Sequence, residues 1–95
     1  MIHVLVIHHR VEDYARFKAH FDAQKVEGKK GGIISYQMFH KAEDPNDLVF
    51  LFDWDNIENF KKYAGSPEFQ REQKDAGLID QPEIYILNEI EKGSL

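Results

Sequence analysis

Cysteine is absent from this chain of 95 residues. Its absence excludes disulfides, thiol catalysis and thiolate metal sites, and it suits a cytoplasmic protein. No apolar run approaches the roughly 20 residues that a membrane-spanning helix needs. The first nine residues contain three histidines and only a short apolar run, which is unlike a signal peptide. We therefore expect a cytoplasmic protein with no membrane partner.

Positive charge is in the minority, with 12 basic against 17 acidic residues and a net charge of −5. A protein that binds nucleic-acid backbones needs a concentrated basic surface. The only basic pairs, Lys29-Lys30 and Lys61-Lys62, do not extend into a patch. Nucleic acid is therefore not expected as a partner.

Apolar residues make up 42% of the chain and charged residues 31%, which is the balance of a folded domain. Seven Phe, four Tyr and one Trp predict an aromatic core, an aromatic interface, or both. A chain this short buries only about two-thirds of its unfolded surface, so dimerisation is a natural source of further stability. We expect one domain over residues 1–92, with residues 93–95 as a C-terminal tail outside it.

Strand signals recur four times, as runs rich in Val, Ile and aromatic residues. The strands are predicted over residues 2–10, 33–42, 48–54 and 84–91. Helical signals lie between the first and second strands and between the third and fourth. The order β-α-β-β-α-β predicts an α+β, ferredoxin-like fold, a four-stranded antiparallel sheet with two helices on one face.

The helix boundaries carry signals of their own. Glu12-Asp13 supplies acid at the start of the first helix, and a glycine-rich loop over residues 27–32 is expected to follow it. Asp55 is the predicted N-cap of the second helical region, which Gly65 interrupts. Ser66-Pro67 then restarts the helix, with a Ser cap and Pro at the first helical position.

Both faces of the predicted sheet are apolar. In the first strand Val4 and Val6 alternate with Leu5 and Ile7, and the strand over 48–54 is apolar on both faces in the same way. Helices bury only one of these faces. The second face predicts association of sheet on sheet, most simply as a two-fold homodimer.

One segment resembles a known family. Trp54 closes the third strand, and Ile57-Glu58-Asn59-Phe60 and Ser66-Pro67-Glu68-Phe69 follow it, a pattern similar to the antibiotic biosynthesis monooxygenase-like family of dimeric α/β barrels. That family includes cofactor-independent monooxygenases of quinols or polyketides, haem-degrading enzymes and many proteins of unknown activity. The resemblance implies a cofactor-independent monooxygenase of a quinol-like or polyketide-like aromatic. The alternative is a non-catalytic or stress-associated barrel that binds a small ligand.

The chain departs from the haem-degrading members of that family. Those members carry an Asn on the first strand, and a Trp and a His on the second helical region. Here no Asn lies between Met1 and Val11, and the matching helical positions hold Tyr63 and Gln73. No histidine follows His40. The comparison disfavours haem degradation, and we expect no cofactor.

Two adjacent histidines are the most prominent polar residues of the first strand. His8 and His9 point to opposite faces of a regular strand, so they cannot chelate one ion as a pair. Imidazole titrates near neutral pH, so His8 at the strand end is our candidate base, with Tyr63 or Trp54 as the donor to a developing anion. The alternative is that these histidines are satisfied by backbone or water, and that Trp54 and Tyr63 only pack.

Aromatic walls with a few hydroxyl groups suit a flat quinol or polyphenol. The predicted substrate-binding residues are Tyr36, Phe50, Phe52 and Tyr85. No carboxylates converge as Mg²⁺ or Ca²⁺ ligands would, so no metal site is expected. His20 is interpreted as a surface residue, and Glu72 as part of a solvated helix face.

Overall fold

The computed structural model describes residues 1–95, and its elements follow the predicted order. The strands are β1 (Ile2–Arg10), β2 (Ile33–Lys41), β3 (Asp44–Trp54) and β4 (Glu83–Leu87). The helices are α1 (Tyr14–Ala23), α2 (Lys25–Lys30), α3 (Ile57–Ala64) and α4 (Pro67–Asp75). The strands pair antiparallel in the order β2-β3-β1-β4, which confirms the α+β, ferredoxin-like fold.

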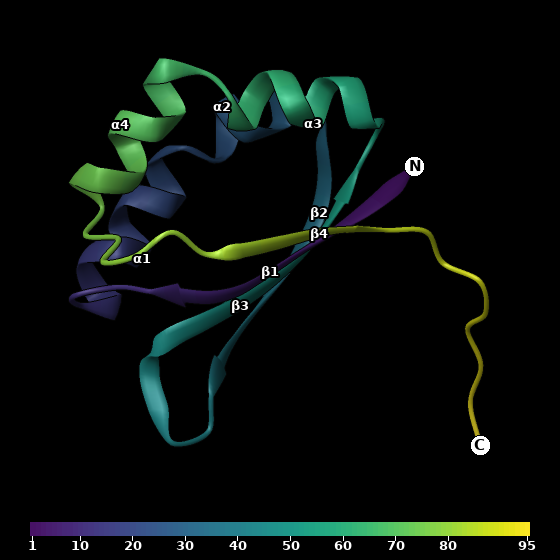
Figure 1. Ribbon diagram of the computed structural model, residues 1–95, viewed down its shortest axis with the longest axis horizontal. Helices are drawn as coiled ribbons and strands as arrows, with labels where there is room; N and C mark the ends of the chain where they lie inside the picture. Colours follow the sequence, from purple (N-terminus) through teal and green to yellow (C-terminus); the bar gives the residue numbers. More distant parts are fainter.

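The helices gather on one side of the sheet, and no helix covers the other side (Figure 1). β2 and β4 are the two edge strands, so the sheet of a single chain is open rather than closed into a barrel. None of the helices is long and apolar enough to span a membrane. The bare face carries Leu5 and Tyr85, which pair across β1 and β4.

Two of the three predicted helix starts are confirmed. The Asp13 carboxylate accepts a hydrogen bond from the backbone N–H of Arg16, and the Ser66 hydroxyl accepts one from that of Phe69. The N-cap of α3 is Asn56, not Asp55 as predicted.

The reason for that change lies in how the two side chains share the available donors. The Asn56 Oδ1 atom accepts the backbone N–H of Asn59 at 2.8 Å, as an N-cap does. The Asp55 carboxylate instead accepts the side-chain amide of Asn59 at 2.8 Å and the backbone N–H of Asn56 at 2.7 Å. Asp55 therefore supports the cap from outside the helix.

Three element boundaries differ from the prediction by more than one residue. Most of the expected loop over 27–32 is helix α2, in which Gly28 is buried and lies close to Ile33 and Tyr63. β3 begins at Asp44 rather than at residue 48, because it extends the ladder with β2. β4 ends at Leu87 rather than at residue 91, where its pairing with β1 stops opposite His3.

The core lies between the sheet and the helices and is small. Only 12 of the 95 residues are buried, because the helices leave a space above the sheet. The buried apolar side chains are Val4, Val6, Val11, Phe17, Leu48, Phe50, Trp54 and Ala76. Most come from alternate positions on β1 and β3, as strand geometry dictates.

A β-bulge in β1 breaks the regular alternation. Val6 lies opposite Phe50 and His9 opposite Leu48. β1 therefore advances by three residues over a distance in which β3 advances by two. The residue that absorbs the change is His8, whose φ of 55° is in the left-handed region. The bulge therefore turns His9 to the helix side, where it is 4% exposed, and turns His8 away from it.

Candidate functional site

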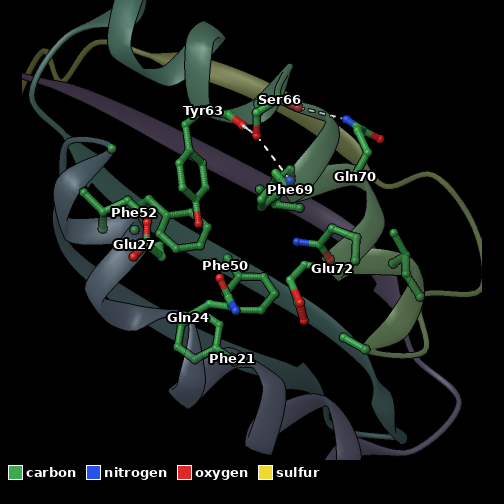
Figure 2. Close-up of a pocket in the computed structure, with 18 of the residues that line it drawn as sticks. Phe21, Gln24, Glu27, Phe50, Phe52, Tyr63, Ser66, Phe69, Gln70 and Glu72 are labelled. Carbon is green, nitrogen blue, oxygen red and sulfur yellow. Dashed lines mark hydrogen bonds between the residues drawn. The ribbon is translucent and has the colours of Figure 1, made fainter.

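A cavity of about 1180 Å³ lies between the inward face of the sheet and the helices. Figure 2 shows Phe50 and Phe52 rising from the sheet, with Tyr63 and Phe69 reaching in from the helices opposite Phe21. Of its 37 lining residues 17 are hydrophobic, several of them aromatic, and most of the others are polar or charged. The cavity is large enough for a small organic molecule, and its aromatic side chains offer such a molecule an apolar surface.

The aromatic wall is ordered by strand geometry. Phe50 and Phe52 stand two positions apart on β3, so they share a face and stack at 5.3 Å with their planes 7° apart. Phe21 of α1 stacks against Phe50 at 5.8 Å. Trp54 continues the row and meets the edge of Phe52 at 5.8 Å. These rings form one continuous surface along the cavity.

Tyr36 lies at the edge of this surface. Its ring meets that of Phe21 edge-on at 5.0 Å, and the Lys25 ammonium lies 5.3 Å from its centre. The Tyr36 hydroxyl and Asp22 both raise the pKa of Lys25, so this lysine stays charged beside the ring. Tyr36 therefore closes the cavity on the β2 side.

The structure brings five of the seven predicted site residues to the cavity. They are Tyr36, Phe50, Phe52, Trp54 and Tyr63. Tyr85 is not among the lining residues, because it shares a face with Leu5 on the bare side of the sheet. His8 does not line the cavity either.

His8 points away because of the bulge described above. Its side chain is 49% exposed, and it lies between two carboxylates of neighbouring strands. The Nδ1 atom is 3.8 Å from Asp47 Oδ2, and the Nε2 atom is 3.7 Å from Glu83 Oε2. The placement leaves His8 without contact to a molecule in the cavity.

The indole nitrogen of Trp54 makes a hydrogen bond within the protein. The indole N–H donates to the backbone carbonyl of Gly31 at 2.9 Å, and the side chain is 3% exposed. Its ring packs against Phe60 and Tyr63. The N–H is therefore not free to hold an anion, and the geometry matches the packing alternative.

Tyr63 reaches from α3 into the cavity, and its hydroxyl makes no hydrogen bond within the protein (Figure 2). Burial raises the pKa of Tyr63, and the nearby Glu27 carboxylate raises it further. The hydroxyl thus keeps its proton at neutral pH and can donate it to a hydrogen bond. The Tyr63 ring lies close to Gly31, and a Cβ added at Gly31 would be only 2.4 Å from Tyr63 Cδ2.

His9 is one of two histidines in the cavity wall. Its Nε2–H donates to the side-chain oxygen of Gln73 at 3.0 Å, and its ring lies edge-on to Phe17 and Phe50. Burial lowers the pKa of His9, and the bond to Gln73 opposes this only in part. His9 is therefore neutral at pH 7, with an Nδ1 atom that is buried and has no hydrogen-bond partner.

A second histidine lines the cavity where the sequence predicted a surface residue. His20 of α1 lies 3.2 Å from Glu72 of α4, measured from Nδ1 to Oε1. Both side chains line the cavity and are about one-third exposed. Neither the spacing nor the composition of the sequence indicates this contact, because the residues are 52 positions apart.

A cluster of three polar side chains, Asp53, Ser35 and His3, lies on the bare face of the sheet, away from the cavity. Asp53 accepts hydrogen bonds from Ser35 at 2.7 Å and from His3 at 2.6 Å, and the bond from Ser35 is the main reason that its pKa is lowered. Asp53 lies between the other two side chains, so His3 is not placed to activate Ser35 as a nucleophile. Nowhere in the structure do three or more His, Asp or Glu side chains converge as metal ligands.

Comparison with solved structures places the chain among proteins of this architecture. A crystal structure described as an antibiotic biosynthesis monooxygenase superposes with a TM-score of 0.72 at 14% identity, covering 96% of this chain and 100% of that one. A putative antibiotic biosynthesis monooxygenase from Bordetella bronchiseptica gives 0.74 at 17% identity, covering 94% and 96%. SnoaB from Streptomyces nogalater, described as a cofactor-independent oxygenase, gives 0.67 at 14% identity, covering 96% and 91%.

Comparison with curated protein sequences finds no match. At identities below one-fifth, the three solved structures show a shared fold and nothing more specific. The family model of antibiotic biosynthesis monooxygenases, in contrast, matches residues 3–75, which include β1 to β3 and the cavity-lining helices. The chain therefore belongs to the antibiotic biosynthesis monooxygenase family.

Proposed function

We propose that this protein is a cofactor-independent monooxygenase of a quinol-like or polyketide-like aromatic compound. The observation that carries the proposal is the aromatic-walled cavity between sheet and helices. Stacked rings at the spacing of Phe50 and Phe52 offer a flat apolar surface to a planar substrate. A family relative described as a cofactor-independent oxygenase shares the fold, which supports the same chemistry here.

In this reaction the substrate itself reduces dioxygen. A quinol ring gains one oxygen atom from O₂, and its two departing hydrogens leave with the other oxygen as water. The product is a hydroxyquinone, so all four electrons come from the substrate. The protein must favour the ionised substrate, stabilise its oxyanion and exclude water.

The cavity residues suit these tasks to different degrees. The Tyr63 hydroxyl is protonated and unpartnered within the protein, so it is our candidate donor to the substrate oxyanion. Phe50, Phe52 and Tyr36 are proposed to hold the ring. Trp54 is proposed to position Gly31 and Tyr63 rather than to touch the reacting atoms.

The alternative function is a binding protein without catalysis. It is favoured by the position of the strand histidines, since His8 is outside the cavity and the free Nδ1 atom of His9 is sealed in its wall. Under this alternative the same aromatic surface binds a small ligand, and no residue moves a proton. The two functions predict the same ligands and differ only in oxygen consumption.

We also propose a homodimer, formed by the bare face of the sheet. Leu5 and Leu51 face this side as a cross-strand pair, and Tyr85 and Phe39 are 45% and 51% exposed there. Apolar side chains on a sheet face are stabilised when a second sheet covers them. A second copy offers an identical face, which suits a two-fold arrangement.

The first experiment is a thermal-shift screen with quinols and polyphenols, followed by oxygen uptake with any compound that binds. A ligand at about 100 times its Kd contributes ~2.7 kcal/mol, or roughly 10–20 °C in a domain of this size. Uptake is measured without added flavin, haem or metal. Tyr63→Phe is expected to reduce turnover, while Tyr85→Phe on the other face of the sheet serves as the matched control.

Binding with oxygen uptake that Tyr63→Phe lowers and Tyr85→Phe leaves unchanged would support the monooxygenase. Binding without uptake by the wild-type protein would favour the binding protein. An absence of binding across the whole screen would contradict the proposal for this class of substrate.

A further inference from the structure

The contact between His20 and Glu72 has the geometry of an oriented base. A carboxylate has only acceptor atoms, so the Nδ1 atom of His20, 3.2 Å from Glu72 Oε1, carries the proton of that bond. In the neutral ring the proton is then absent from Nε2. That nitrogen has no hydrogen-bond partner in the protein, which leaves its lone pair free to accept a proton.

The position of the pair is as important as its geometry. α1 and α4 bring the two side chains together at the cavity, and both line it. Figure 2 shows Glu72 directed toward the same space as Phe50. Each side chain keeps about one-third of its surface accessible, so a molecule in the cavity can reach the histidine.

His9 provides an instructive contrast within the same wall. Its Nε2–H is held by Gln73, the residue next to Glu72, and its Nδ1 atom is sealed from the cavity. A proton on His9 would have no carboxylate to stabilise it, whereas Glu72 would stabilise one on His20. Of the two cavity histidines, only His20 therefore combines an accessible lone pair with an orienting carboxylate.

We propose that His20 is the base that ionises the bound substrate and that Glu72 is its positioning residue. The inference rests on the proposed function, and it specifies a substrate that enters as a neutral phenol. The O–H bond of the phenol breaks, an N–H bond forms at His20 Nε2, and the electron pair stays on the phenolate oxygen. Glu72 stabilises the imidazolium that results.

The test follows the proton directly, with 4-nitrophenol as the probe. Its phenolate absorbs visible light and its neutral form does not, so ionisation is read without turnover. At about pH 7, where an ordinary imidazole is mostly unprotonated and much of the free probe is still neutral, we expect binding to the wild-type protein to add a phenolate band to that of the free probe. 4-Nitroanisole, which has no proton to lose, is expected to bind without a band and to serve as the ligand control.

Two variants and one matched control test whether the band depends on His20 and Glu72 in particular. His20→Gln is expected to abolish the band, and Glu72→Gln to lower the ratio of bound phenolate to phenol by about two- to fivefold. Glu68→Gln, also in α4 and at the cavity, removes a carboxylate that contacts no histidine and is expected to leave the band unchanged. A pair as exposed as His20 and Glu72 contributes little to folding, so all three variants are expected to fold.

An added band that persists in both His20→Gln and Glu72→Gln would overturn the inference, and so would a wild-type protein that binds the phenol with no added band. The failure of the monooxygenase itself has a different signature. A wild-type protein that ionises the probe through His20, yet consumes no oxygen with any quinol, would overturn the proposed reaction alone. Where uptake is found, His20→Gln is expected to lower kcat by about 10²-fold or more.

Discussion

The burial of His9 makes a specific prediction about how stability depends on pH. In the folded chain burial lowers the pKa of His9 below its ordinary value of 6.5, whereas the unfolded chain exposes the ring to water. Between pH 6.5 and the lower pKa of the folded chain, the unfolded state therefore binds a proton at His9 that the folded state does not bind. The free energy of unfolding should fall as the pH falls through this window, level off below the folded pKa, and be unaffected above it.

The size of the effect follows from linkage. One proton bound only by the unfolded state changes the free energy of unfolding by about 1.4 kcal/mol per pH unit. The slope approaches this value only between the two pKa values of His9, where the unfolded state is mostly protonated and the folded state is not. Asp53 also contributes to the free energy of unfolding, because its pKa is lowered from 3.8 in the folded chain. That contribution is lost only at more acidic pH, as the pH falls through and below 3.8.

The assay compares the wild-type protein with His9→Gln in urea titrations from about pH 7.5 to about pH 5. Trp54 is the only tryptophan and is buried, so its fluorescence reports unfolding. Glutamine keeps a donor for Gln73 but does not titrate, and the other histidines are common to both proteins. If both proteins lose stability with the same slope, His9 is not a buried neutral histidine and the reasoning fails.

Three further predictions follow from the packing. Phe50→Ala removes a ring that is 2% exposed and should cost about 3–5 kcal/mol in urea unfolding; a shift below 1 kcal/mol would contradict this assignment of the core. Gly31→Ala must displace the Tyr63 ring and should weaken 4-nitrophenol binding in calorimetry, whereas Gly93→Ala, with nothing within 4 Å, should leave binding unchanged. Leu51→Glu places a charge on the bare sheet face and should give a monomeric mass in sedimentation, where the wild-type protein gives a dimer.

Much of the fold was predictable because its signals are local. The strand over 2–10 and the Ser66 cap depend on residue types and spacings within a few positions, and both are as predicted. The aromatic wall was predictable in the same way, since Phe50, Phe52 and Trp54 alternate on the part of β3 that has no irregularity of its own. Local pattern was enough wherever the backbone was regular.

The remaining features depend on contacts that no local pattern contains. The left-handed φ of His8 decides which histidine enters the cavity, and nothing beside it in the sequence marks a bulge. The contact of His20 with Glu72 depends on how α1 and α4 pack over the sheet. Gly28 suggested a loop, but its lack of a side chain instead lets α2 lie close to Ile33.

The bulge of β1 contains two adjacent histidines, His8 and His9. This repetition affects how the protein tolerates the deletion of one residue. If His8 were deleted, β1 would pair regularly, with Val6 still opposite Phe50 and the surviving histidine opposite Leu48, the partner that His9 has now. Alternation alone would then direct that histidine toward the helices. Because the two neighbours are identical, a one-codon deletion removes the outward imidazole and spares the inward one. Few single-residue deletions inside a strand would leave a cavity wall with the same composition.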